Sequence, residues 1–108
     1  MSDARAIYKA AFASFLANRL DEAIDGFRRA LALDPTLALA WNGLSKSLER
    51  KGDVEGALEA ARRLAELEPA DPLSHTNLSQ LYQRQGRIPE AEEAKATAMR
   101  LQMKQQGR

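Results

Sequence analysis

The chain repeats itself at a spacing of 34 residues, and this repeat constrains its fold more than any other feature. Small side chains recur at Ala23, Ala57 and Ala91. Four further sets recur at the same spacing: Asn18, Gly52 and Gly86; Leu20, Val54 and Ile88; Leu33, Leu67 and Leu101; and Ile7, Trp41 and His75. A fixed period of roughly 20 to 50 residues is typical of stacked-repeat proteins, in which each unit buries its apolar face only against its neighbours. The 108 residues therefore hold three units, about the minimum for an independently stable array.

Each unit is predicted to form two helices. The expected ranges are 4–17 and 21–33, 38–51 and 54–67, and 72–85 and 88–105. Gly52 and Gly86 follow the first helix of their units, where glycine ends a helix at little cost because it readily adopts a left-handed conformation. Asn18 takes the same place in the first unit, and asparagine is the usual second choice there.

Proline and short polar residues mark the other helix ends. Pro35 and Pro69 close the second helices of their units, because proline cannot continue the hydrogen-bond ladder of a helix. Asp53 and Asp71 are predicted to cap the helices 54–67 and 72–85, and Thr36 is a further cap candidate for the helix 38–51.

The repeated small residues indicate where helices cross. Ala23, Ala57 and Ala91 are expected at the crossing of the two helices of each unit, because a larger side chain would push them apart. Trp41 and His75 share one register and are expected to pack between helices. The remaining core space is expected to be filled by Phe27, Leu44, Leu48, Leu64, Leu78 and Tyr82.

The charge of the chain is balanced. Its 16 basic and 15 acidic residues give a net charge of +1, so electrostatics does not favour nucleic acid or an anionic membrane as a partner. The pairs Arg28-Arg29 and Arg62-Arg63 lie one repeat apart, and nearby acidic residues favour solvated helix faces over a phosphate-binding stripe.

The sequence offers little for catalysis. His75 is the only histidine, its register indicates a packed position, and the chain has no cysteine, so neither a metal site nor a nucleophile–base set is expected. Gly52 and Gly86 are isolated and form no glycine-rich phosphate loop. We therefore predict that the protein is not an enzyme and uses no cofactor.

No targeting segment is predicted. No apolar run approaches the roughly 20 residues that span a bilayer. The short apolar run 10–17 follows Arg5 and Lys9, as in a secretory signal, but Asp3 precedes it and the run keeps the phase of the first repeat. We expect a cytoplasmic protein.

The three units together resemble the tetratricopeptide repeat family. The second unit carries Trp41-x2-Leu44 followed by Ala57 and Pro69, and the first and third carry parts of the same pattern, such as Ala23-x3-Phe27 and Leu78-x3-Tyr82. The resemblance covers nearly the whole chain and implies one domain, 1–108, with repeats near 4–37, 38–71 and 72–105. The implied fold is an all-α solenoid, a right-handed superhelix of three antiparallel helix pairs.

The departures from the family pattern are informative. Ser45 and Ser79 replace a small glycine, which keeps the requirement for a small residue. Some members of the family clamp the carboxylate tails of heat-shock chaperones with Lys, Asn and Arg, but Gly43, Leu73 and Asn77 stand at three positions of that set here. The resemblance therefore does not favour binding of chaperone tails.

In the family, the first helices of the units line a concave face that holds an extended peptide or a helix. The function implied is a non-catalytic protein-interaction module or adaptor with a protein or peptide partner. The candidate groove residues lie off the core phase of these helices: Tyr8, Phe12 and Phe15 in unit one; Asn42, Lys46, Glu49 and Arg50 in unit two; and Thr76, Asn77, Gln80, Gln83 and Arg84 in unit three. Amide side chains can pair with both polar groups of a peptide backbone, and the basic side chains can meet a carboxylate.

Two questions stay open at this point. The stripe of Tyr8, Phe12 and Phe15 fits an apolar anchor of the groove, a part of the core, or an oligomer contact. In the first two units, apolar residues of the second helix are expected to face the following unit. At the same positions of the last helix the residues are polar, as a terminal repeat needs. Met99, Leu101 and Met103 nevertheless remain apolar, so the alternative function is a scaffold that self-associates weakly through its terminal helices.

Overall fold

The computed structural model describes residues 2–107 and contains six α-helices in that range. Their bounds are α1 Ser2–Leu16, α2 Leu20–Leu33, α3 Ala38–Lys51, α4 Val54–Leu67, α5 Pro72–Arg84 and α6 Ile88–Gln106. Every predicted helix is present, and each end lies within two residues of its predicted position.

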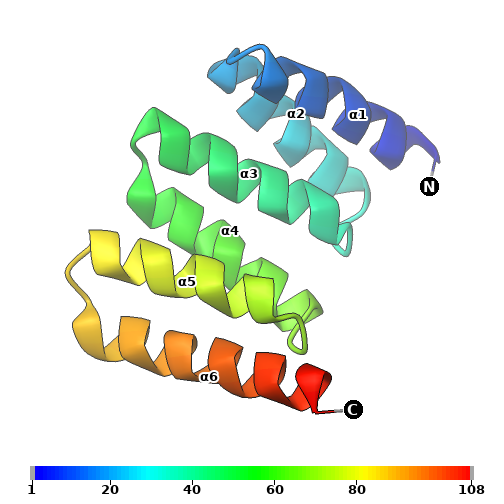
Figure 1. Cartoon of the computed structure of the whole chain (residues 1–108). Coiled ribbons are helices and arrows are strands. Elements are labelled where there is room, and N and C mark those ends of the chain that lie inside the picture. Colours follow the sequence, from blue (N-terminus) through cyan, green and yellow to red (C-terminus); the bar gives the residue numbers. More distant parts are fainter. Residues whose placement is uncertain (1, 108) are drawn as a thin grey trace.

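The helices stack in chain order as three pairs. The most extensive packing lies within the pairs α1–α2, α3–α4 and α5–α6, and the contacts of α2 with α3 and of α4 with α5 join one pair to the next. Figure 1 shows these pairs laid one upon another from α1 at one end to α6 at the other. The predicted all-α solenoid of three antiparallel helix pairs is confirmed.

The predicted stop and start signals act as expected. Asn18, Gly52 and Gly86 have φ angles of 61°, 102° and 74°, the left-handed conformation that ends the first helix of each unit. Asp53 Oδ1 accepts a hydrogen bond of 2.9 Å from the backbone N–H of Gly56. Asp71 Oδ1 accepts one of 3.0 Å from the N–H of Leu73, so both caps are confirmed.

The prediction that Thr36 caps α3 is wrong. The N-cap position belongs to Leu37, which offers no side-chain hydrogen bond. Thr36 instead donates twice to Asp34 Oδ1, from its backbone N–H at 3.0 Å and from its hydroxyl at 2.7 Å. The aspartate thus closes a local turn in the loop before α3, and Thr36 lies one residue before the N-cap position.

The crossing points of the pairs are as tight as predicted. Ala23, Ala57 and Ala91 are fully buried. At the same crossings, Ser45 Oγ donates to the carbonyl of Ala57 at 2.9 Å, and Ser79 Oγ donates to the carbonyl of Ala91 at 2.9 Å. The two serines therefore add a hydrogen bond as well as a small volume.

The larger core residues also occupy their predicted positions. Phe27, Leu44, Leu48, Leu64 and Leu78 are buried, whereas Tyr82 is half-buried.

Trp41 and His75 make the same contact one repeat apart. The indole N–H of Trp41 donates to the carbonyl of Pro35 at 2.7 Å, and His75 Nε2 lies 2.8 Å from the carbonyl of Pro69. A carbonyl only accepts, so a hydrogen bond here requires a proton on Nε2 of His75. Both rings are half-buried and tie the start of a first helix to the loop before it.

Candidate functional site

The twelve predicted groove residues lie on the first helices of the pairs, α1, α3 and α5. The repeat places them in shared registers, such as Tyr8 with Asn42 and Thr76, or Phe12 with Lys46 and Gln80. The structure places most of them in three regions: an aromatic group on α1, a hollow between α3 and α5, and a smaller hollow between α5 and α6.

A hollow of about 290 Å³, here called the groove pocket, lies between α3 and α5. Of the predicted residues, it brings together Asn42, Lys46 and Asn77. The whole lining is Ala38, Leu39, Asn42 and Lys46 from α3, Leu64 and Glu68 from the end of α4, and Asp71, Leu73, Ser74 and Asn77 at the start of α5. The groove pocket therefore combines apolar walls, two amides and charges of both signs.

Two leucines of the groove pocket were missed by the sequence analysis. Leu39 is 51% exposed and Leu73 is 65% exposed, and they lie one repeat apart on α3 and α5. Exposed leucines in the same register of two adjacent units are a signal that could have found them. The sequence analysis treated Leu73 only as a departure from the chaperone-binding set and did not consider Leu39.

Ser74 adds a polar group to the wall of the groove pocket. It is buried, and its hydroxyl has no hydrogen-bond partner among residues 2–107. A buried hydroxyl without a partner costs roughly 1–3 kcal/mol.

Three of the four charged residues predicted for the groove, Glu49, Arg50 and Arg84, make contacts within the protein. Arg84 Nη1 lies 3.0 Å from Glu49 Oε2, which links α5 to α3. The guanidinium of Arg50 lies 4.3 Å from the centre of the Phe15 ring, a cation–π contact. None of the four side chains in these two contacts lines the groove pocket.

The aromatic stripe on α1 runs from the core to the surface. The ring of Tyr8 lies 5.8 Å from that of the buried Phe27 and 6.0 Å from that of Phe12. Phe12 lies 6.3 Å from Phe15 and is 41% exposed, while Tyr8 and Phe15 are half-buried. Tyr8 is therefore anchored in the core, and Phe12 is the member of the stripe that is most available to a partner.

The remaining predicted residues lie towards the end of the stack. Thr76, Gln80 and Gln83 line a hollow of about 240 Å³ together with Ser79 and Lys95 of α6. The hydroxyl of Thr76 donates to the carbonyl of Pro72 in its own helix, at 3.1 Å.

No helix within 2–107 combines the length and the apolar character that crossing a membrane requires. In the same part of the chain, no cluster of three or more His, Asp or Glu side chains is placed to hold a metal ion.

Comparison with known families agrees with the geometry. A family model described as tetratricopeptide repeat matches residues 17–74 and, in a second register, 42–102. Together the two matches span most of the sequence. The chain belongs to the tetratricopeptide repeat family. No curated protein matches it.

Several solved structures have the same fold. A crystal structure of MamA superimposes with a TM-score of 0.93 at 25% identity, over 97% of this chain and 61% of MamA. A chain of the CopN–Scc3 complex gives 0.89 at 26% identity, over 94% of this chain and 59% of that one. The second TPR of Spaghetti (RPAP3), bound to the HSP90 peptide SRMEEVD, gives 0.84 at 17% identity over 91% of both chains. The chain thus spans less than two thirds of the MamA and CopN–Scc3 chains that it matches.

Proposed function

We propose that the protein is a non-catalytic interaction module that binds an extended peptide or a helix of a partner across α1, α3 and α5. The observation that carries this proposal is the groove pocket, in which two exposed leucines lie beside two amides. Leu39 and Leu73 offer apolar surface to one side chain of the ligand. Asn42 and Asn77 can pair with the N–H and C=O groups of its backbone, which an extended peptide leaves free.

The adjoining residues extend the contact. Lys46 can meet a carboxylate at the edge of the groove pocket. Phe12, exposed on α1, supplies a second apolar anchor on the same side of the stack. Two structural neighbours support binding of this kind: one was solved with a peptide bound and another within a complex.

The test is affinity capture from the native cell followed by mass spectrometry. The groove variant Asn42→Ala/Asn77→Ala is compared with the wild type and with Gln102→Ala/Gln106→Ala, which removes two exposed amides from α6. We expect a partner that the wild type and the α6 variant retain and that the groove variant loses. Equal capture by all three proteins would contradict the proposal.

A second candidate function is self-association, and exposed apolar side chains on α6 favour it. Met99 is 52% exposed and Met103 is 68% exposed, whereas Leu101 is partly buried. Glu92 and Lys95 on the same helix are exposed and oppose a close apolar contact. Sedimentation at several concentrations tests this alternative: a monomer even at high concentration would remove it, and a weaker association of Met99→Ser/Met103→Ser would support it.

A further inference from the structure

A second hollow lies between α2 and α4, on a different face of α3 from the groove pocket. It measures about 420 Å³ and is here called the α2–α4 hollow. It shares no lining residue with the groove pocket. Its lining is Arg28, Leu31 and Ala32 from α2, Pro35 from the loop, Trp41, Leu44 and Leu48 from α3, and Gly56, Glu59, Ala60 and Arg63 from α4.

The floor of the α2–α4 hollow is apolar. Leu44 and Leu48 rise from α3 beneath it, and the ring of Trp41 closes one end. On the α4 wall, Gly56 and Ala60 present at most a methyl group. Leu44 and Leu48 are each 5% exposed, so a side chain from outside would reach only their upper surface and the half-buried ring of Trp41.

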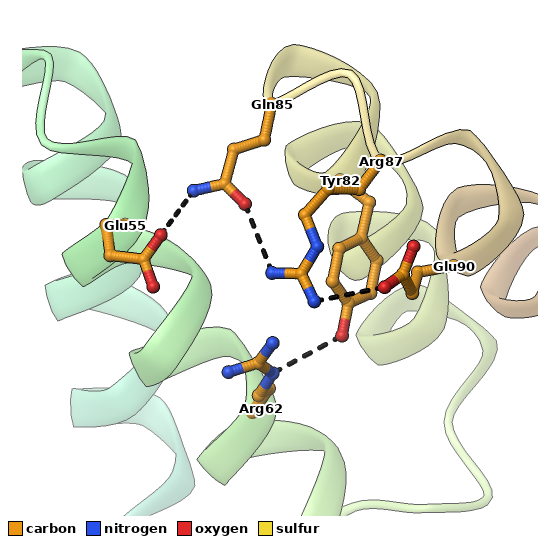
Figure 2. Close-up of polar contacts among 6 residues, drawn as sticks. All are labelled: Glu55, Arg62, Tyr82, Gln85, Arg87 and Glu90. Carbon is orange, nitrogen blue, oxygen red and sulfur yellow. Dashed lines mark hydrogen bonds and ion pairs between the residues drawn. The ribbon is translucent and has the colours of Figure 1, made fainter.

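The next junction of the stack shows the same place filled. Tyr82 stands one repeat after Leu48, and Arg62 stands one repeat after Arg28. Arg62 Nε donates to the hydroxyl of Tyr82 at 3.3 Å, and the guanidinium of Arg87 lies 4.9 Å from the centre of the Tyr82 ring. Figure 2 shows these side chains meeting between α4 and α5.

Further contacts hold the filled junction together. Arg87 Nη2 lies 3.1 Å from Glu90 Oε2, and Gln85 Nε2 donates to Glu55 Oε1 at 2.6 Å. In Figure 2, Arg62 meets the hydroxyl of Tyr82, the Arg87–Glu90 pair lies beside the Tyr82 ring, and the Gln85–Glu55 pair lies farther from it. The third unit thus closes its junction with its own aromatic ring and hydrogen-bonding groups.

Arg28 lacks the partner that Arg62 has. Leu48 offers it no hydroxyl, and within residues 2–107 Arg28 makes no hydrogen bond or ion pair. The other charges lining the hollow are Glu59 and Arg63, and Arg63 Nη1 lies 3.4 Å from Glu66 Oε1. Arg28 and Leu48 also line an adjoining hollow with Asp21, Lys51 and Asp53, in which Lys51 pairs with Asp21. Among residues 2–107, Arg28 thus forms no ion pair, and it lies between the apolar floor and a hollow that holds Asp21 and Asp53.

We propose that the α2–α4 hollow is a second binding site, which takes a peptide segment with a large apolar side chain next to a single carboxylate. The apolar side chain packs on Leu44, Leu48 and Trp41, and the carboxylate pairs with Arg28. The ligand thereby supplies the two groups that Tyr82 and its neighbours supply at the next junction. One carboxylate suits the site better than an acidic run, because Glu59 stands at the same rim. The proposal does not depend on the groove pocket.

The experiment uses a short peptide, capped at both ends, in which one phenylalanine is followed by one glutamate. Two control peptides carry glutamine in place of the glutamate or alanine in place of the phenylalanine. Binding is read from the fluorescence of Trp41, the single tryptophan of the chain and a part of the hollow. Amide chemical shifts in NMR report in parallel whether α2 and α4 respond or the groove pocket does.

Three variants of the full chain sharpen the test. Leu48→Tyr copies the residue of the filled junction and is expected to abolish binding by occupying the α2–α4 hollow. Arg28→Gln is expected to weaken binding of the glutamate peptide roughly fivefold, with no effect on the glutamine peptide. Arg29→Gln is the matched control, because Arg29 faces Asp25 and does not line the hollow, and it is expected to bind as the wild type does.

Loss of binding in a folded Leu48→Tyr protein, with a selective effect of Arg28→Gln, supports the site. Should Leu48→Tyr fail to fold, the comparison of Arg28→Gln with Arg29→Gln decides. A fluorescence of Trp41 that does not respond to the peptide, shifts confined to the groove pocket, or equal binding of the glutamate and glutamine peptides would overturn the proposal.

Discussion

Ser45 and Ala57 are joined by a hydrogen bond of 2.9 Å from the serine hydroxyl to the alanine carbonyl, across the crossing of α3 and α4. Ser79 and Ala91 repeat the bond at the crossing of α5 and α6, with the same length. Ala11 is the counterpart of Ser45 in the first unit, at the crossing of α1 and α2. There the two helices are so close that a methyl group on Gly26 would lie 2.7 Å from the Cβ of Ala11. Small side chains alone allow close packing at the first crossing, whereas the other two crossings add a hydrogen bond from a serine.

Replacing Ser45 with alanine should therefore destabilise the protein only modestly. The lost hydrogen bond is worth about 1 kcal/mol, and part of this is offset because alanine is the better helix former by roughly 0.5 kcal/mol. We expect Ser45→Ala to lower the free energy of unfolding by about 0.5–1 kcal/mol, measured by urea denaturation. A variant more stable than the wild type would show that the serine serves only as a small residue.

Enlarging Ala57 tests the crossing itself. Ala57 is fully buried, so Ala57→Leu must push α3 and α4 apart. Overpacking of this kind costs roughly 1–3 kcal/mol. The matched control is Ala96→Leu on α6, where the side chain is exposed and the change should be nearly neutral. Thermal unfolding of the two variants should differ clearly, and equal melting temperatures would contradict the observed packing.

Phe12 and Phe27 should respond differently to truncation. Phe27 is fully buried, and Phe27→Ala is expected to cost roughly 3–5 kcal/mol of stability. Phe12 is 41% exposed, so Phe12→Ala should shift the melting temperature by only a few degrees while reducing capture of the partner. A loss of stability in Phe12→Ala as large as that in Phe27→Ala would assign the whole aromatic stripe to the core.

The stability of the loop before α3 should depend on pH through Asp34. Its hydrogen bonds from the Thr36 side chain, and then from the Thr36 backbone, hold the pKa of Asp34 below its ordinary value. The folded state therefore binds this proton less readily than the unfolded state, so the contribution is present above the unfolded pKa and is lost as the pH falls through the folded pKa.

Asp34→Asn removes this contribution. The stability difference between the wild type and the variant should be largest near neutral pH and should shrink below about pH 4. Urea denaturation at a series of pH values measures it. A difference that is constant from neutral to acidic pH would mean that the carboxylate of Asp34 plays no part in the turn.

Much of the fold could be predicted because each unit carries its own boundary signals. Asn18, Gly52 and Gly86 end helices through local backbone conformation, and Asp53 and Asp71 cap them through hydrogen bonds to residues two or three positions away. Such effects depend on neighbours in sequence. The prediction for Thr36 failed because Leu37, one residue later, occupies the N-cap position, and the Thr36 hydroxyl bonds to Asp34.

The site was harder to predict, because it depends on contacts between units. The sequence shows Leu39 and Leu73 in one register, but their place beside a hollow depends on how far apart α3 and α5 stand. Glu49 and Arg84 are 35 residues apart, and only the stacking of the helices brings them together. Similarly, Arg28 and Arg62 look equivalent in the sequence, and the packed structure shows that only Arg62 meets a tyrosine.

The affinity of a captured partner for matched leucine variants tests most directly whether the groove pocket binds it. Leu39→Ser/Leu73→Ser removes the exposed apolar walls of the groove pocket, and Leu33→Ser/Leu67→Ser removes two leucines of another register, on α2 and α4. We expect the first variant to bind at least about tenfold more weakly, since two apolar contacts of this size are worth more than about 1.4 kcal/mol together, and the second to bind like the wild type. Full affinity in a folded Leu39→Ser/Leu73→Ser protein would contradict the proposed function.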